Sequence, residues 1–354
     1  MKAHLGTLGS LVVVAAIAGC GGSSPPPQTG GATPGDSSAP PVDTVGTTPE
    51  PPPTAELLAG IKAFDAGNFA DARTSFEAAT KKDPKNYEAF FNLGQACEKL
   101  GDKPAAEAAY RSSVALKPEF DTAVAALSSL MLDAQRIDDA MAVAKAGLAK
   151  HPGSAPLHEN LGIALAMHGD QDPAAAEMSQ AIKTAPSEPM YHITFAHWLN
   201  AWHVRGAAPH LDAARDLVKD DYAMLAEIGF EYRMAGEFDS CIKTFDRAVA
   251  IKDGGEVRTE RALCKLGVKD EPGTLADLQA AVAKEPNYAP AHYYLGGRLA
   301  GAKHYKEAAA EYAKYLELAP SGSLAKPATE KLKMAQDAAA HDKGGAQPPP
   351  KKKK

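Results

Sequence analysis

The sequence predicts an all-α fold in which helical hairpins are stacked into one array, and three observations lead to this prediction. Prolines recur at a fixed interval of 34 residues, at Pro84, Pro118, Pro152 and Pro186. A proline ends a helix because it lacks an amide donor and clashes with the preceding turn. Apolar residues follow a helical period almost without interruption, and only 6% of the residues are aromatic, which suits closely packed helices.

The N-terminal segment, residues 1–19, is predicted to be a signal peptide. Lys2 precedes an apolar run, Leu5–Ala18, that is too short to span a membrane comfortably. The run ends in the letters IAGC, which resemble the lipobox of bacterial lipoproteins. This resemblance implies cleavage before Cys20, two acyl chains on that cysteine, and anchoring in the outer membrane. An ordinary signal peptide with a chance cysteine is the alternative.

Two further segments are predicted to be disordered. Residues 20–53 contain ten prolines and no lysine or arginine, so they cannot bury enough apolar surface to fold and are expected to form a tether. Residues 343–354 end in PPPKKKK and are expected to form a basic tail. This tail is either a solvated terminus or a contact for an anionic surface or partner.

Charge and cysteine content exclude some function classes. The net charge is −6, and it becomes about −7 when residues 1–19 and their single lysine are removed, which opposes a nucleic-acid role. Three cysteines remain after Cys20, at Cys97, Cys241 and Cys264. An odd count argues against a disulfide framework, and all three lie in apolar helical patterns, where burial is expected. A Cys241–Cys264 bridge is the less favoured alternative.

The same residue types return in the same slots of successive units between residues 54 and 320. In the second unit these slots hold Phe90, Leu93, Gly94, Ala106, Tyr110 and Pro118. The pattern resembles the tetratricopeptide repeat (TPR), in which small residues let two helices approach closely. The resemblance implies a right-handed superhelical TPR solenoid of about eight helix-turn-helix repeats over residues 54–320. Residues 321–342 are expected to form a C-terminal capping helix.

Three units depart from the pattern, so their geometry is less clear from the sequence. The third has Ser128 and Ala144 in the small and aromatic slots, and the seventh has a polar first helix, Glu256–Arg261. The fifth is out of register around Pro209 and is expected to be either a helix pair or a bend.

No motif for catalysis is present, so the protein is predicted not to be an enzyme and to need no cofactor or metal. The densest aromatic and histidine segment is YHITFAHWLNAWH, which contains His192, His197, His203, Trp198 and Trp202. Its histidines are spaced by five and six residues, whereas a metal site on one helix needs a spacing of four. Aromatic packing is expected, with a partner hot spot or a metal site as alternatives.

The first helices of the pairs are expected to line an inner groove that binds partner proteins. The expected lining residues are Leu57, Ile61, Phe64, Phe91, Asn92, Gln95, Asn160, Ile163, Met167, Ile193, His197, Phe230, Arg233 and Tyr293. Asn92 and Asn160 occupy the slot that, in TPR proteins gripping extended peptides, holds an asparagine on the ligand backbone. Surface asparagines without such a role are the alternative. With few cations in this set, an amphipathic helix or a hydrophobic strand is the expected ligand.

These expectations combine into a scaffold hypothesis. The lipid on Cys20 holds the protein at the outer membrane facing the periplasm, and the groove binds envelope proteins of a secretin or pilus, motility, secretion or peptidoglycan-synthesis machine. The organisation is similar to that of TPR pilotins and of TPR lipoproteins that scaffold cell-wall enzymes. An adaptor that regulates an envelope enzyme and a structural lipoprotein without a groove ligand are the alternatives.

Overall fold

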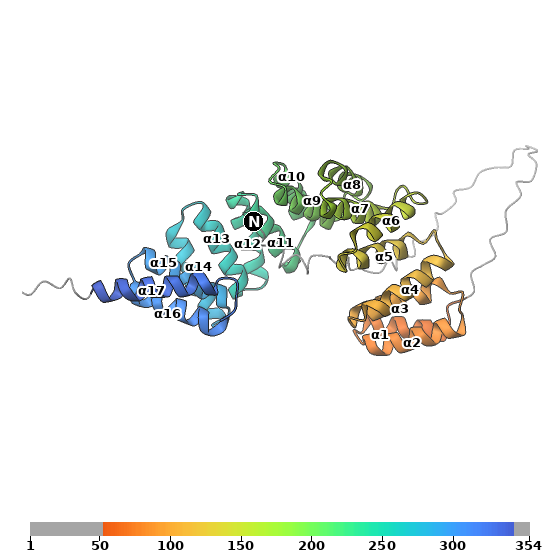
Figure 1. The fold of residues 1–354 in the computed structure, drawn as a ribbon, viewed down its shortest axis with the longest axis horizontal. Coiled ribbons are helices and arrows are strands. Elements are labelled where there is room, and N and C mark those ends of the chain that lie inside the picture. The colour runs from red at the N-terminus through yellow and green to blue at the C-terminus, as the bar shows by residue number, and fades with distance from the viewer. Residues whose placement is uncertain (1–51, 343–354) are drawn as a thin grey trace, which may run out of the picture. The chain divides into compact units, whose positions relative to one another are not determined.

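The computed structural model describes residues 52–342, and within this range the protein has seventeen helices and no strand (Figure 1). The all-α repeat fold is thereby confirmed. The first helices of the eight pairs are α1 (Ala55–Asp65), α3 (Tyr87–Lys99), α5 (Asp121–Asp133), α7 (Ala155–His168), α9 (Pro189–Ala201), α11 (Tyr222–Met234), α13 (Gly255–Gly267) and α15 (Ala289–Gly301). The second helices are α2 (Phe69–Lys82), α4 (Lys103–Leu116), α6 (Ile137–Leu148), α8 (Gln171–Thr184), α10 (Ala207–Leu217), α12 (Phe238–Ile251), α14 (Glu271–Lys284) and α16 (Tyr305–Leu318).

The helices fall into two compact units, which divide between Ala174 and Ala175. The first unit is described from residue 52 and the second to residue 342. The predicted signal peptide, Cys20, the basic tail and nearly all of the tether lie outside the described residues. In the second unit the expected capping helix is α17 (Ala325–Asp342), which packs on α16.

A glycine-to-ring contact closes the helix pairs that carry the pattern. A Cβ atom placed on Gly60 of α1 would lie 2.4 Å from the Phe76 ring of α2. The same contact would be 2.5 Å between Gly94 and the Tyr110 ring. Only a residue without a side chain lets the two helices of a hairpin approach this closely. The aromatic side chain therefore fills the space beside the glycine of its own hairpin.

The turn inside every hairpin places one residue in the left-handed region. Four of these residues are glycines and four are not. In chain order they are Gly67, Gly101, Gln135, Gly169, His203, Gly236, Lys269 and Lys303, with φ between 57° and 107°. The amide of the residue after each one donates to a carbonyl five residues earlier, as in Asn68 N to Ala63 O at 2.9 Å. This hydrogen bond caps the first helix of each pair.

The shared turn settles the geometry of the three irregular units. His203 joins α9 to α10, so the fifth unit is a helix pair and not a bend, with Pro209 in the first turn of α10. In the third unit the Ser128 hydroxyl of α5 donates to the Ala140 carbonyl of α6 at 3.1 Å. In the seventh unit Asp270 caps α14 by accepting from the Gly273 amide at 3.0 Å.

Cys241 and Cys264 form a disulfide, which corrects the expectation drawn from the odd cysteine count. The two residues lie on α12 and α13, and their Cα atoms are 6.0 Å apart. The third cysteine, Cys97, is free and buried in the first unit. The odd count was misleading because stacking brings two residues of neighbouring hairpins together and leaves the third in the other unit. These three cysteines are buried, as their apolar helical patterns predict.

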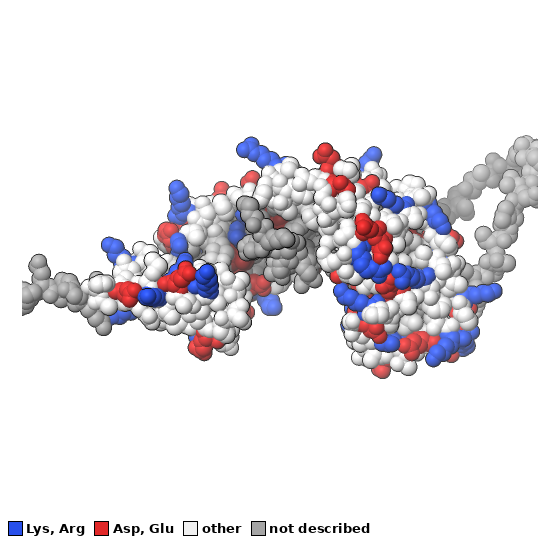
Figure 2. All heavy atoms as spheres, viewed as in Figure 1, with Lys and Arg blue, Asp and Glu red and all other residues white. Residues whose placement is uncertain are grey.

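Charged side chains of both signs are interspersed with broad uncharged areas on the face of each unit shown in Figure 2. No uniformly basic patch stands out on this face. Within the described residues, no helix is both long and apolar enough to cross a membrane.

Candidate interaction surface

The first helices of neighbouring pairs contact one another within each unit. In the first unit α1 contacts α3 and α5 contacts α7, and in the second α11 contacts α9 and α13, and α13 contacts α15. The sides of these helices that face away from the second helices form what we call the first-helix face. Each unit has its own first-helix face, which corresponds to the expected inner groove.

Apolar side chains are exposed on the first-helix face of the first unit. Leu58 and Ile61 of α1 are 52% and 37% exposed and lie three residues apart, on one side of the helix. Asn92 and Gln95 of α3 are half-buried beside a buried core. Ile163 of α7 is partly buried against that core.

Phe91 is buried, which corrects its placement among the lining residues. Its side chain is 9% exposed, and its ring centroid lies 5.8 Å from that of Tyr110 and 5.2 Å from that of Phe120. Phe120 precedes α5 and covers Phe91 from the next hairpin. Phe91 is therefore part of the core of the first unit. Leu57 and Ile193, also expected to line the groove, are buried in the same way.

Asn160 is buried too, and its amide is engaged inside the fold. Its Nδ2 donates to the Ala125 carbonyl at 2.8 Å and so joins α7 to α5. Asn92 occupies the same slot but is only half-buried, so its amide stands nearer to solvent. The two asparagines therefore differ, and only Asn92 keeps the accessibility that contact with a ligand backbone needs.

Phe230 and Met234 provide an apolar stripe on the second unit. They lie one turn apart on α11 and are 39% and 55% exposed. The Arg233 guanidinium lies over the Phe230 ring at 4.9 Å, and its Nε donates to Glu260 Oε2 of α13 at 2.9 Å. Arg233 therefore links α11 to α13 and positions the Phe230 ring next to the contact between these two helices.

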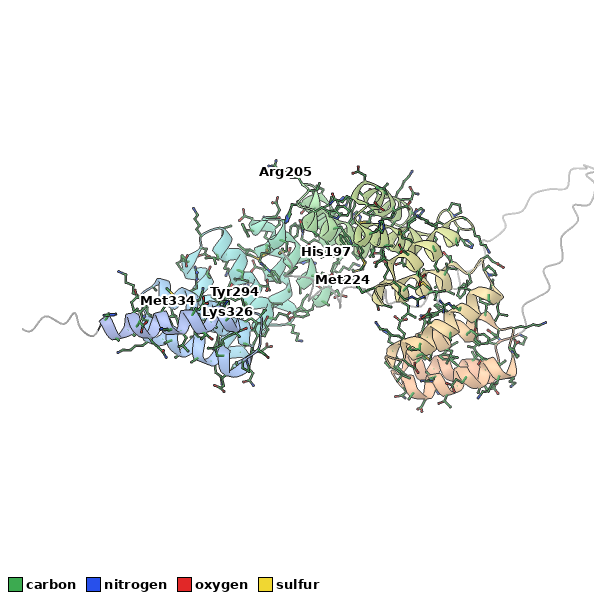
Figure 3. All side chains as sticks on the ribbon, viewed as in Figure 1. His197, Arg205, Met224, Tyr294, Lys326 and Met334 are labelled. Carbon is green, nitrogen blue, oxygen red and sulfur yellow. A yellow bond between two sulfur atoms is a disulfide. The ribbon has the colours of Figure 1, made fainter. Side chains whose placement is uncertain are left out.

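A buried carboxylate organises the contact between α9 and α11. Glu231 is 2% exposed and accepts hydrogen bonds from His197 Nδ1 at 2.8 Å and from Asn200 Nδ2 at 2.7 Å. Burial by itself lowers the pKa of His197, but the hydrogen bond and charge of Glu231 outweigh it and raise that pKa above its ordinary value. His197 is therefore drawn toward its charged form by a fixed partner inside the protein. The position of His197 is labelled in Figure 3.

Glutamates gather on α11 and α13, and the prediction of the lining residues did not include them. Glu227 and Glu231 lie one turn apart on α11, as do Glu256 and Glu260 on α13. Burial is the largest cause that raises the pKa of Glu227 and of Glu260. Glu227 and Glu260 are the sixth residues of their helices, the slot that Asn92 holds in α3. Glu227 and Glu260 are 33 residues apart, close to the 34-residue interval of the prolines, so carrying that slot along the chain would have revealed them.

Tyr293 is covered by the capping helix. Its ring lies 5.9 Å from that of Tyr312 and 5.6 Å from that of Tyr315, and Lys331 Nζ of α17 stands 5.0 Å above it. The neighbouring Tyr294 is half-buried on α15 and is labelled in Figure 3. Tyr293 thus packs the cap onto the last repeat instead of lining an open surface.

The histidine and tryptophan segment is mostly packing. His192 is buried with its Nδ1 atom 3.3 Å from that of His210, and the Phe195 ring lies 4.6 Å from the His210 ring. Burial lowers the pKa of His192 and of His210. His203 forms the hairpin turn. Among the described residues there is no group of three side chains that could hold a metal ion.

Comparison with known proteins agrees with this geometry. The profile of the tetratricopeptide repeat family matches residues 57–119 and 126–189. The two matched stretches cover about a third of the chain and are similar to tetratricopeptide repeats. The later hairpins have the same turn and, at Gly229 with Phe245 and Gly296 with Tyr312, the same glycine-to-ring contact. The later hairpins therefore share the all-α repeat fold of the matched stretches.

Solved structures with a similar arrangement include three proteins with TPR-like folds. Yeast Tom70 matches with a TM-score of 0.51 and 14% identity over 83% of this chain and 65% of its own. The Cut9–Hcn1 tetramer of APC/C matches at 0.49 and 16% identity over 79% of this chain, which spans 55% of that one. PilW, a type IV pilus biogenesis factor, matches at 0.48 and 19% identity over 55% of this chain and 91% of its own. No curated protein matches the sequence.

Proposed function

We propose that the protein is a scaffold held at the cell envelope by lipid on Cys20, where its first-helix face binds proteins of an envelope machine. The tether, residues 20–53, sets the reach of the repeats: about 35 Å as a flexible coil and roughly 100 Å if fully extended as polyproline. The outer membrane, facing the periplasm, is the proposed location. A secretin, pilus, motility, secretion or cell-wall synthesis apparatus is the proposed setting.

The observation that carries the proposal is the pair of exposed apolar stripes on first helices. Leu58 with Ile61, and Phe230 with Met234, each present two large apolar side chains on one side of a helix. Exposed apolar side chains lose their contact with water when an apolar partner covers them, and this stabilises a complex. An amphipathic helix of a partner fits such stripes because its own apolar residues recur at three and four positions.

Two features support an exported location. The sequence of residues 1–20 has the order of a lipoprotein signal, with a basic residue, an apolar run and the IAGC box. The Cys241–Cys264 disulfide also favours export, because disulfides persist in oxidising compartments and are rare in the bacterial cytosol.

Photocrosslinking in living cells tests the proposed surface. A photoreactive residue is placed at Ile61, Gln95 or Phe230, and the captured proteins are identified by mass spectrometry. The matched controls are Arg111 of α4 and Lys243 of α12, which are exposed on second helices. We expect the same envelope protein from the first-helix positions and not from the controls. Equal capture from both sets would refute the surface.

The anchor is tested separately with Cys20→Ala. We expect loss of membrane association and of function, and recovery of both when another membrane anchor replaces the lipid. A variant that keeps full function while soluble would remove the anchor from the proposal. Capture of an enzyme whose turnover changes on binding would instead identify the protein as a regulatory adaptor.

A further inference from the structure

Five glutamates of the second unit cluster on α11, on α13 and at the turn after α14. The cations of α13 are engaged elsewhere, because Arg258, Arg261 and Lys265 all pair with Asp277 of α14. We call the set Glu227, Glu231, Glu256, Glu260 and Glu285 the acidic face. The first four lie on α11 and α13, which contact each other. The fifth follows α14, and a Cβ atom on Gly255, the first residue of α13, would lie 2.9 Å from its side chain. The turn after α14 therefore brings Glu285 beside the start of α13.

Internal partners neutralise only part of this charge. Arg233 pairs with Glu260, and His197 with Glu231. Glu256 and Glu285 are exposed, and within residues 52–342 neither forms an ion pair. Glu227 has a buried Oε1 atom with no hydrogen-bond partner in the described part of the chain. Two exposed carboxylates, Glu256 and Glu285, are thus left to interact with something outside the described fold, and Glu227 adds one buried oxygen without a partner.

Tyrosines lie among these carboxylates. Tyr288 precedes α15, and a Cβ atom on Gly255 would lie 3.2 Å from it, so Tyr288 stands at the start of α13 with Glu285. Tyr222 and Tyr294, at the beginning of α11 and on α15, are also half-buried. Half-buried aromatic rings beside carboxylates suit a segment that combines prolines with cations, because prolines pack on rings and cations pair with acids.

The chain itself contains such a segment. Residues 343–354 read KGGAQPPPKKKK, with three consecutive prolines directly before four lysines. The positive charge of these lysines complements the exposed, unpaired carboxylates of Glu256 and Glu285. Extended proline-rich segments dock on aromatic surfaces at low entropic cost because their backbone is already restricted.

The length of the segment allows it to return to the acidic face. Lys331 contacts Tyr293, and from there α17 runs to Asp342, eleven residues and about 17 Å further on. The twelve residues that follow can span about 40 Å when extended. About 17 Å of the extended tail is needed to run back along α17 to the level of Tyr293. Beyond that point Lys351 can reach a further distance of some 14 Å, and Lys354 some 24 Å. Packed helices lie 8–10 Å apart, so these lysines can reach α13 and α11.

We propose that residues 343–354 dock on the acidic face of the same chain, with the prolines on Tyr288 and Tyr294 and the lysines on the glutamates. The face then becomes available to a basic or proline-containing partner segment only when the tail leaves. The regulatory role of the tail rests on the proposed function, whereas the docking itself does not require a partner.

Zero-length carbodiimide crosslinking of the purified full chain tests the docking. The reagent joins an amine to a carboxylate only when the two are in contact. We expect crosslinks from Lys351, Lys352, Lys353 and Lys354 to Glu256, Glu260 or Glu285, with a yield that falls severalfold between 50 and 500 mM salt. An equal mixture of isotope-labelled and unlabelled protein tells contacts within a chain from contacts between chains. Crosslinks only between chains, or spread evenly over all exposed carboxylates, would overturn the proposal.

A peptide titration gives a second readout. The peptide GGAQPPPKKKK is titrated into the wild-type chain and into a variant with the four terminal lysines replaced by serine. We expect at least tenfold tighter binding to the variant, because the tethered tail competes at millimolar effective concentration. Within that variant, Glu256→Gln with Glu285→Gln should weaken binding about fivefold. Glu307→Gln with Glu330→Gln, exposed on α16 and α17, should leave it unchanged.

The outcomes separate this inference from the proposed function. Equal peptide binding to wild type and variant would refute the docking and leave partner capture at Ile61 and Phe230 unaffected. Binding of the tail to phosphatidylglycerol vesicles, without crosslinks to the acidic face, would assign it to the membrane surface instead. If the intrachain crosslinks form but no partner is captured, the scaffold proposal is refuted and the docking of the tail is still supported.

Discussion

Replacing two first-helix phenylalanines by alanine should separate stability from binding. Phe91 is 9% exposed and packs against two other rings, so its removal leaves a cavity in the first unit. Phe→Ala at such sites costs about 3–5 kcal/mol. Phe230 is 39% exposed, and Arg233 lies over its ring. Its loss should cost about 1 kcal/mol or less in the free protein.

Urea denaturation measures both effects. Far-ultraviolet circular dichroism reports on all helices, while the fluorescence of Trp198 and Trp202 reports on the second unit alone. We expect Phe91→Ala to lower the urea midpoint of the first unit. This change should appear in the circular dichroism signal and not in the tryptophan fluorescence. Phe230→Ala should leave both signals nearly unchanged while it reduces partner capture. A large loss of stability from Phe230→Ala, or a loss below about 1 kcal/mol from Phe91→Ala, would refute the assignment of buried and exposed sides.

Three further predictions concern the disulfide, a turn and a titrating pair. Reduction of the Cys241–Cys264 bond, whose cysteines are 23 residues apart, should destabilise the second unit by about 3.5 kcal/mol, seen as a lower midpoint of tryptophan fluorescence with reductant. Lys303→Gly should stabilise by about 1 kcal/mol because φ is 65° there, whereas glycine inside α16 should destabilise by a similar amount; thermal unfolding compares them. The pKa of His197 is raised above its ordinary 6.5, so its contribution to stability is complete below about pH 6.5 and is lost as the pH rises through the folded-state pKa. The unfolding free energy of the second unit should therefore fall as the pH rises above 6.5, and His197→Gln should flatten this slope. An equally steep slope in His197→Gln would refute the role of the pair.

Repeat periodicity was readable from the sequence because it depends on local rules. The proline that follows six of the eight hairpins, and glycine opposite an aromatic residue, act over distances of one hairpin, as with Gly94 and Tyr110. The hairpin turns follow the same logic, although four of them lack glycine. His203 was read as part of an aromatic cluster because only the backbone reveals that it has a positive φ.

The candidate surface was only partly predictable. Phe91 and Phe230 both stand on first helices, and their sequence neighbourhoods give no sign that one is covered and the other is not. Phe120, from the next hairpin, decides the burial of Phe91. The amide of Asn160 is engaged by the carbonyl of Ala125, which lies 35 residues earlier.

By itself, the sequence determined the class of fold, the number and order of the helix pairs, and the absence of recognisable catalytic motifs. These properties follow from periodicity and from turn residues, which act on neighbours in the chain. The tertiary structure alone decided which first-helix side chains are exposed, that Cys241 meets Cys264, and that glutamates of α11 and α13 share one face. Each of these depends on how hairpins stack, because stacking brings residues about 20 to 35 positions apart into contact, and burial and charge are set by those contacts.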